Sequence, residues 1–145
     1  MAAPGALELS KLLKSMNPGL DPETYVFATI AKDPPNQELA NLLRSAASRA
    51  EMLFKEAEGW TVILTQAVAD ELGIDYIFPC RKVTLNVHSS LDAVGFLAAV
   101  TTRLAERVSI GINPVSGYYH DHLFVPAGKE ELAMSELKAM AAEQS

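Results

Sequence analysis

Apolar and polar residues alternate through residues 82–88, where the sequence reads KVTLNVH. A period of two residues predicts a strand with one buried face. The residues that follow carry apolar side chains at helical spacing, so we expect a helix that is opened by Ser89 and Ser90 and runs to about residue 107. The second half of the chain therefore begins with a strand followed by a helix.

The remainder of the chain gives shorter elements of both kinds. After the helix, the pattern predicts strands at 108–113 and 118–125, a turn at 114–117, a break at 126–128 and a last helix at 129–142. In the first half, it predicts a helix at 10–16, a strand at 24–31, a hairpin of 52–57 with 60–66, a helix at 67–72 closed by Gly73, and a strand at 75–78 ended by Pro79.

The polar, Ala-rich stretch at 37–50 is read as helical, but as an excursion between two strands rather than as a core helix. The order of elements in the second half is that of a ferredoxin-like β-α-β-β-α-β unit without its final strand. The first half has a surplus strand near its own end, so the two halves should complete each other. We expect an α+β fold with antiparallel sheets and helices on one face, divided into residues 8–80 and 81–142.

Composition narrows the class of protein. Eighteen acidic against twelve basic residues give a formal net charge of −6, which disfavours nucleic acid and an anionic membrane surface as partners. The single cysteine, Cys80, excludes an internal disulfide and a Cys-rich zinc module. No apolar stretch is long enough for a membrane helix, and the first residues lack the pattern of a signal peptide. We therefore expect a cytoplasmic protein.

The predicted junction between strand and helix at 87–95 is the strongest candidate for a binding site. The start of a helix presents unpaired N–H groups and a partial positive charge, which receive a carboxylate or a phosphate. Asp92 would favour a zwitterion such as an amino acid, and Gly95 would leave room for a ligand near the backbone. The alternative is that Ser89, Ser90 and Asp92 only cap the helix and Gly95 only permits close packing.

Three further features allow chemistry but have simpler explanations. His120 and His122 are two residues apart and would share one face of a strand, where they could bind zinc with His88, or merely form hydrogen bonds. Tyr118 and Tyr119 are an aromatic pair that could line a small-molecule site or belong to a turn. Nothing around Cys80 resembles the motif of a catalytic cysteine.

Two stretches carry a family resemblance: VTLNVHSSLDAVGFLAAVTTRLAE at 83–106 and INPVSGYYHDHLFVP at 112–126. Both resemble the second half of small stand-alone proteins with tandem ACT domains. The upstream stretches LSKLLKSMNPGL, TYVFATI and FKEAEGWTVILTQAVADELG resemble the more divergent first half of such proteins. The resemblance covers residues 9–137, although the segment at 33–50 is longer than expected.

The resemblance implies two ferredoxin-like ACT units in a non-enzymatic protein that binds a free amino acid, forms a homodimer and acts on an enzyme of amino-acid metabolism, without a cofactor. In ACT domains the ligand commonly lies where the first strand meets the first helix, near an interface between units. The implied binding residues are His88, Ser89, Ser90, Leu91, Asp92, Ala93, Val94 and Gly95, with Ile112, Asn113, Pro114 and Val115 on the facing segment. The alternative is a constitutive interaction module without a small ligand.

Overall fold

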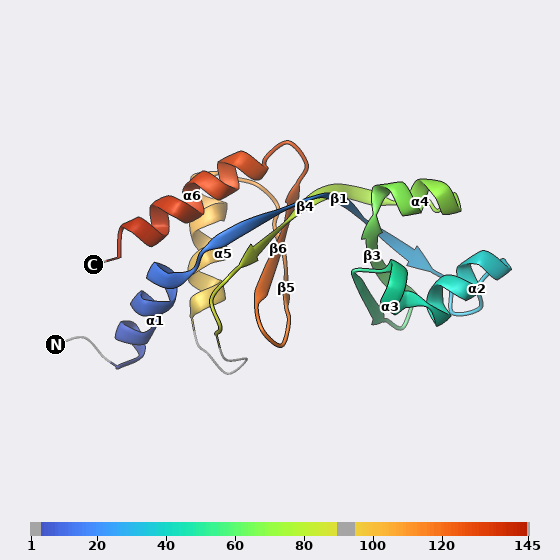
Figure 1. Ribbon diagram of the computed structural model, residues 1–145, viewed down its shortest axis with the longest axis horizontal. Helices are drawn as coiled ribbons and strands as arrows, with labels where there is room; N and C mark the ends of the chain where they lie inside the picture. Colours follow the sequence, from blue (N-terminus) through green and yellow to red (C-terminus); the bar gives the residue numbers. More distant parts are fainter. Residues whose placement is uncertain (1–3, 90–94, 145) are drawn as a thin grey trace. The chain divides into compact units, whose positions relative to one another are not determined.

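The computed structural model describes residues 4–89 and 95–144, and it divides into two compact units (Figure 1). Unit 1 comprises Met1–Pro22 and Arg81–Ser145, and unit 2 comprises Glu23–Cys80. Each unit is described by itself. The division into units at 8–80 and 81–142, which was drawn along the sequence, stays a prediction.

Unit 2 contains a complete β-α-β-β-α-β series. Its elements are most of β1 (Pro18–Ile30), α2 (Gln37–Arg44), α3 (Ala46–Arg49), β2 (Met52–Lys55), β3 (Trp60–Thr65), α4 (Gln66–Leu72) and the first part of β4 (Ile77–Leu85). The strands lie in the order β2-β3-β1-β4. β3 pairs antiparallel with both β1 and β2, so that Trp60 lies opposite Ile30 on one side and Lys55 on the other.

Helix α2 belongs to the core of unit 2, which corrects the prediction that residues 37–50 are an excursion. Its side chain Leu42 is 3% exposed and lies in a cluster with Val26, Ala28 and Val62. The helix begins after Asn36, whose Oδ1 accepts a hydrogen bond from the N–H of Leu39 at 2.9 Å. Its apolar stripe is narrow, and the polar residues around it obscured the helical pattern.

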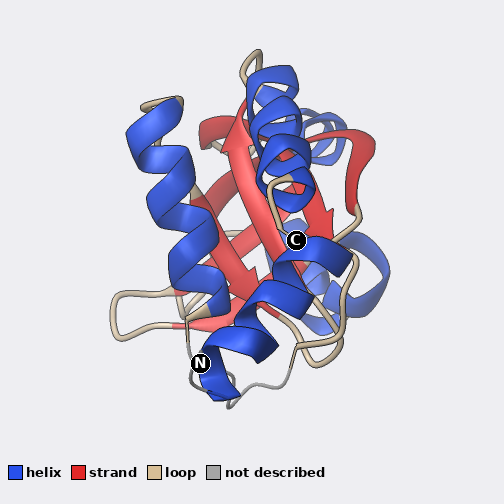
Figure 2. Cartoon of the chain, turned by 90° about the vertical axis from the view of Figure 1, so that its left-hand side faces the viewer, coloured by secondary structure: helices blue, strands red, loops and turns tan. Residues whose placement is uncertain are grey.

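Unit 1 contains the other elements. These are α1 (Pro4–Ser15), the start of β1, the end of β4, α5 (Phe96–Arg107), β5 (Asn113–Ser116), β6 (Asp121–Pro126) and α6 (Glu130–Ala142). Its strands lie in the order β1-β4-β6-β5, and its helices cover one face of them (Figure 2). No helix within residues 4–89 and 95–144 is long and apolar enough to cross a membrane.

The fourth strand of unit 1 comes from the beginning of the chain. Residues 18–22 of β1 lie beside β4, so both units have the same order of strands. The prediction that the two halves complete each other is therefore correct, but the surplus strand was placed at the wrong end of the first half. The reason is that β1 extends from Pro18 to Ile30, well beyond the predicted 24–31.

Several predicted boundaries were wrong because proline was taken as the end of a strand. Pro79 lies inside β4, which joins the predicted strands 75–78 and 82–88 into one, and Pro114 lies inside β5, where a turn was predicted. The predicted strand at 108–113 is absent, since the backbone at Ser109 is left-handed, with φ of 52°. His120 precedes β6 rather than lying within it.

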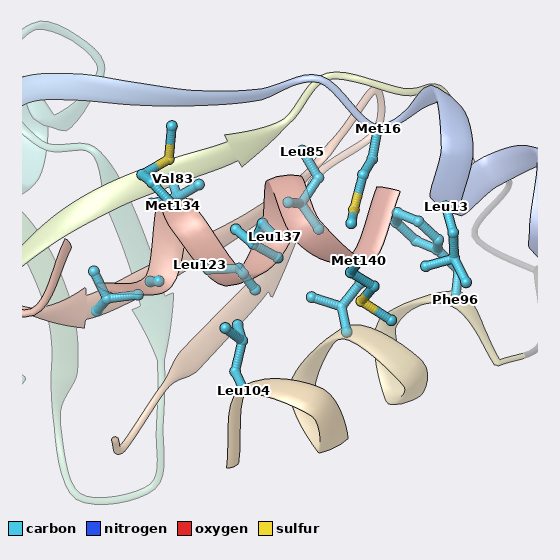
Figure 3. Packing of buried hydrophobic residues seen from close by; sticks show 13 residues of the cluster. Leu13, Met16, Val83, Leu85, Phe96, Leu104, Leu123, Met134, Leu137 and Met140 are labelled. Atoms are coloured by element: carbon cyan, nitrogen blue, oxygen red, sulfur yellow. The ribbon is translucent and has the colours of Figure 1, made fainter. Parts of the chain in front are cut away.

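The core of unit 1 is formed by side chains from its three helices against β4 and β6 (Figure 3). The buried members of this cluster are Leu13, Met16, Val83, Leu85, Phe96, Val100, Leu104, Leu123, Val125, Ala133, Met134, Leu137 and Met140. Because α1 contributes Leu13 to this cluster, and Met16 follows directly after its last residue, the first helix is part of the core.

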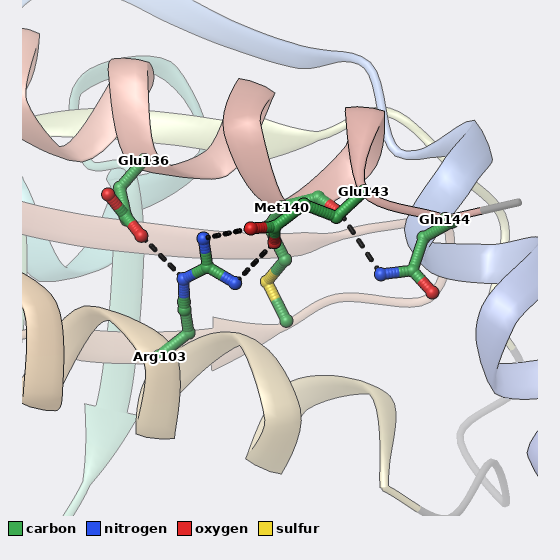
Figure 4. A network of polar contacts seen from close by, with 5 residues as sticks. All are labelled: Arg103, Glu136, Met140, Glu143 and Gln144. Carbon is green, nitrogen blue, oxygen red and sulfur yellow. Dashed lines mark hydrogen bonds and ion pairs between the residues drawn. The ribbon is translucent and has the colours of Figure 1, made fainter.

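A polar network ties α5 to the end of α6 (Figure 4). The guanidinium of Arg103 donates hydrogen bonds to Glu136 at 2.5 Å and to both carboxylate oxygens of Glu143, at 2.5 and 3.1 Å. The hydrogen bonds from Arg103 hold the pKa of the Glu143 carboxyl below its ordinary value. The network therefore fastens two helices of unit 1 at its surface.

Candidate ligand-binding site

The structure places the predicted junction between the end of β4 and the start of α5. β4 ends at Leu85 and α5 begins at Phe96, with Gly95 as its N-cap. Because the N-cap is Gly95, the prediction that Ser89 opens the helix was wrong. The predicted site residues Ser90, Leu91, Asp92, Ala93 and Val94 lie outside the described residues.

Gly95 determines both the backbone conformation and the capping at the start of α5. It has a φ of +92°, a backbone conformation that L side chains rarely adopt, and its carbonyl accepts the N–H of Ala99 at 2.9 Å. This position is the N-cap of α5. Since glycine has no side chain to accept hydrogen bonds from the first-turn N–H groups, it leaves those donors to other acceptors.

A buried carboxylate lies next to the junction. Asp121, at the start of β6, is only 8% exposed and is the buried charged residue of the described chain. The hydroxyl of Ser89 donates to its Oδ2 at 3.3 Å, and the hydroxyl of Ser116 donates to its Oδ1 at 2.6 Å. Ser89 therefore contacts the hairpin of β5 and β6 instead of capping α5.

Two histidines make further contacts between the same segments. His88 Nδ1 lies 3.3 Å from the carbonyl oxygen of Tyr119, and His120 Nδ1 lies 3.5 Å from that of Val87. A carbonyl oxygen only accepts, so in both histidines Nδ1 carries the proton. Each of the two segments, the one after β4 and the turn before β6, thus provides a histidine that donates to a carbonyl of the other.

The three histidines do not converge. His122 Nδ1 lies 2.9 Å from the hydroxyl of Thr84, whereas His120 and His88 have the backbone partners described above. His120 lies in the turn, so the face-sharing rule for alternate strand residues does not apply to it. In the part of the chain that the structure describes, no group of three His, Cys, Asp or Glu residues is arranged to hold a metal ion.

The segment predicted to face the junction begins before β5 and runs into it. Asn113, Pro114 and Val115 are strand residues, opposite Phe124, Leu123 and His122 of β6 respectively. Ile112 packs against the core of unit 1. Because β6 lies between β4 and β5, the polar contacts of Ser89 and His88 described above reach the turn and β6 rather than residues 112–115.

The tip of this hairpin carries the aromatic pair noted in the sequence. Tyr118 and Tyr119 are 76% and 67% exposed, and their rings meet edge to face with centroids 4.9 Å apart. The backbone carbonyl of Tyr119 is the partner of His88. The pair therefore lies at the turn that the junction contacts, and neither tyrosine is packed into the core.

Cys80 is buried in unit 2, and its Sγ donates to the carbonyl of Tyr25 at 3.3 Å. Burial raises the pKa of the thiol from its ordinary value of 9.0 to about 12. A thiol that stays protonated at neutral pH is a poor nucleophile, so this geometry gives Cys80 a packing role.

The raised pKa of Cys80 predicts a loss of stability at high pH. The folded state holds the thiol proton more tightly than the unfolded state, so this contribution is complete below pH 9 and is lost as the pH rises toward 12. A Cys80→Ala variant lacks this titration. The difference in the free energy of unfolding between wild type and variant, measured in urea, should therefore shrink above pH 9. A difference that is the same at neutral pH and at pH 11 would contradict the prediction.

Unit 2 has surface hollows of its own. One of 420 Å³ is lined by polar residues of its helices, among them Glu38, Arg49 and Glu71, and Arg49 pairs with Glu71 there. Another of 350 Å³ is more apolar and is lined by Phe27, Ile77 and neighbouring residues. None of the predicted binding residues that the structure describes lines either hollow.

Sequence reasoning missed Asp121 and Ser116 as partners of the junction. Asp121 lies between His120 and His122 in the sequence, and the sequence analysis gave it no role. A carboxylate two residues before the apolar run LFV was the available signal, because a charge at the start of a buried strand needs a donor nearby. Which serine would supply that donor depends on contacts between distant residues.

Two family models match the chain, and both describe the ACT domain. One matches residues 4–81 and the other residues 78–139. A comparison with curated protein sequences gives no match.

Solved structures with the same fold include proteins of known and unknown function. A Vibrio cholerae protein of unknown function, described as a possible transport protein, is 36% identical over 94% of this chain and 98% of its own, with a TM-score of 0.79. The regulatory subunit of aspartate kinase from Thermus flavus has a TM-score of 0.59 at 14% identity, over 87% of this chain and 98% of its own.

A third structure is a longer chain, of which the match covers one third. E. coli aspartokinase III, solved in complex with aspartate and ADP, has a TM-score of 0.63 at 14% identity, over 87% of this chain and 33% of its own. The likenesses at low identity show a shared fold. They confirm the predicted α+β architecture of two ferredoxin-like units in tandem.

Proposed function

Because the chain belongs to the ACT-domain family, we propose that it is a non-enzymatic regulatory protein that binds a free amino acid where β4 meets α5. The proposal rests on the start of α5, where the N-cap residue Gly95 makes no side-chain cap hydrogen bond. Gly95 offers no side-chain acceptor to the first turn, and α5 is twelve residues long, so its dipole favours a negative charge at this end. A ligand carboxylate would accept the first-turn N–H groups, as anions do at other helix starts.

The ammonium group of the ligand needs a negative partner in the same place. Asp92 is the residue that we assign to this role from the sequence, with His88, Ser89 and Ser90 around the ligand. Two copies are expected to pair through sheet edges, since ACT units join in this way and pairing would cover edges that otherwise invite aggregation. Binding would then change the affinity for the second copy or for a partner enzyme of amino-acid metabolism.

A thermal-shift screen against the standard amino acids tests the proposal. A ligand present at about 100 times its dissociation constant should stabilise the folded state by about 2.7 kcal/mol, which raises the unfolding midpoint by several degrees. The amino acid that binds should have a much smaller effect on Asp92→Ala and Ser90→Ala. Ser135→Ala, which removes an exposed hydroxyl from α6, is the matched control and should respond as the wild type does. Equal binding by all these variants would place the site elsewhere.

A constitutive interaction module without a small ligand is the second candidate function. It is supported by exposed apolar side chains on unit 2, where Phe54 and Ile77 are 61% and 72% exposed. Such side chains more often mark a protein interface than an amino-acid site when they lie in a larger patch. A midpoint that no amino acid changes, together with a stable dimer in light scattering, would favour this function.

A further inference from the structure

The end of β4 is tied to the turn before β6 by side chains where the ladder of backbone hydrogen bonds has stopped. β4 ends at Leu85, yet three successive residues beyond it still reach the hairpin. Val87 accepts from His120, His88 donates to Tyr119, and Ser89 donates to Asp121. These contacts link residues 87–89 to residues 119–121, and each of the two segments provides both donors and acceptors.

Asp121 differs from the other members of this set because it is a buried carboxylate. Burial of a charge is costly unless hydrogen bonds compensate it, and here each carboxylate oxygen receives one hydroxyl. Hydrogen bonds to an ionised acceptor are about twice as strong as neutral ones. The hydrogen bond from Ser89 is therefore the contact that joins the segment after β4 to the buried carboxyl group of the hairpin.

We propose that Asp121 is a positioning residue, which holds Ser89 and thereby sets the path of the backbone that enters the junction between β4 and α5. The inference rests on the proposed function, because the path it sets is one side of the proposed amino-acid site. Asp121 itself does not touch the ligand in this scheme. It acts through Ser89. The Ser116 hydroxyl donates only to Oδ1, the carboxylate oxygen that Ser89 does not contact.

The same contacts would also occur if Asp121 only stabilised the hairpin. The two roles differ in what they change. A hairpin role affects stability and is shared by Ser116, whereas a positioning role affects the order of the backbone at Ser89 and the affinity for a ligand. A matched set of variants on the two hydroxyls of one carboxylate separates them.

The test compares Asp121→Asn and Ser89→Ala with Ser116→Ala and with Ser89→Thr, which keeps a hydroxyl at position 89. Amide order parameters are measured first in the ligand-free protein. The value at Ser89 should fall from about 0.85 toward about 0.6 in Asp121→Asn and Ser89→Ala. It should be unchanged in Ser116→Ala and restored in Ser89→Thr. This measurement does not depend on any ligand.

Affinity is measured next, by titration calorimetry with the amino acid that raises the unfolding midpoint of the wild type most. Asp121→Asn and Ser89→Ala should each bind it about tenfold more weakly, and the double variant should lose no more than either single variant. Ser116→Ala should lower the unfolding midpoint without ligand but leave the affinity within about twofold, which a hairpin role alone does not predict.

The outcomes separate the two proposals. Unchanged order parameters at Ser89, or an affinity in Asp121→Asn equal to that of the wild type, overturn the positioning role. Equal losses of order and affinity in Ser116→Ala also overturn it, in favour of a hairpin role. If no amino acid shifts the wild type but the order parameters fall as expected, the proposed function fails while the control of the backbone by Asp121 stands.

Discussion

A chain that begins at Glu23 should keep a folded unit 2 and lose the folded state of unit 1. The deletion removes α1 with the buried side chain of Leu13, the buried Met16 that follows the helix, and residues 18–22 of β1, which lie beside β4. Burying an apolar side chain of this size contributes about 1.5–3 kcal/mol, and the loss of the strand leaves one edge of β4 unpaired. The total approaches the entire stability of a small domain, which is about 5–15 kcal/mol.

The single tryptophan makes this prediction measurable. Trp60 lies in β3 of unit 2, so its fluorescence reports on that unit alone. Unit 2 is close to the roughly 60 residues at which domains fold alone with marginal stability. We expect a cooperative urea transition of Trp60 in the truncated chain, but collapsed amide NMR dispersion for residues 95–144. A chain that begins at Pro4 keeps α1 and β1 and is the control. Dispersed signals from residues 95–144 in the shorter chain would contradict the prediction.

Replacement of Leu137 by alanine should be the most damaging kind of single truncation in unit 1. Leu137 is fully buried in α6 and packs in the cluster shown in Figure 3. A buried leucine cut back to alanine costs about 2–5 kcal/mol, because transfer free energy is lost and a cavity remains. The free energy of unfolding in urea, followed by far-ultraviolet circular dichroism, measures the loss.

Leu132 provides the matched control for that measurement. It is the same residue type on the same helix, but it is 51% exposed. Leu132→Ala should therefore change the free energy of unfolding by no more than about 0.5 kcal/mol. Similar losses in the two variants would mean that α6 does not pack as described.

The fold could be predicted from the sequence where the hydrophobic periodicity extends over many residues. The prediction failed where a proline lies inside a strand instead of ending it. The helices predicted at 10–16 and 129–142 correspond to α1 and α6, and the helix predicted to end near residue 107 corresponds to α5 at that end. Pro22 and Pro79 were placed outside the predicted strands at 24–31 and 75–78, yet both lie within strands. A proline is tolerated where a strand forms the edge of its sheet, because the missing N–H would have had no partner there.

The positions of these prolines follow from the shared strands. β1 is the edge strand in unit 1, where Pro18 and Pro22 lie, and β4 is the edge strand in unit 2, where Pro79 lies. Each strand is central in the other unit and has no proline in that part. A reading of the local sequence could not use this rule, since it requires knowing which unit each half of the strand belongs to.

The candidate site could be predicted as a location but not as a set of contacts. The strand-to-helix change near residues 88–95 was visible in the periodicity. The partner of Ser89 was not, because Asp121 is 32 residues away and the pairing depends on the β5–β6 hairpin. Gly95 was recognised as unusual, but its role as the N-cap depends on a backbone angle that no local pattern specifies.

The origin of the fourth strand of unit 1 also has a consequence for folding on the ribosome. Residues 4–22 are synthesised before residues 81–144, which provide the partners that bury Leu13 and Met16. Unit 2 is contiguous and can fold during translation, whereas the apolar face of α1 stays exposed until the rest of unit 1 has been synthesised. The end of α6 lies close to α1, since the hydroxyl of Ser10 donates to Gln144 Oε1 at 3.2 Å. A circular permutant that places residues 4–22 after residue 144 would make both units contiguous, so that α1 is synthesised after the residues it packs against.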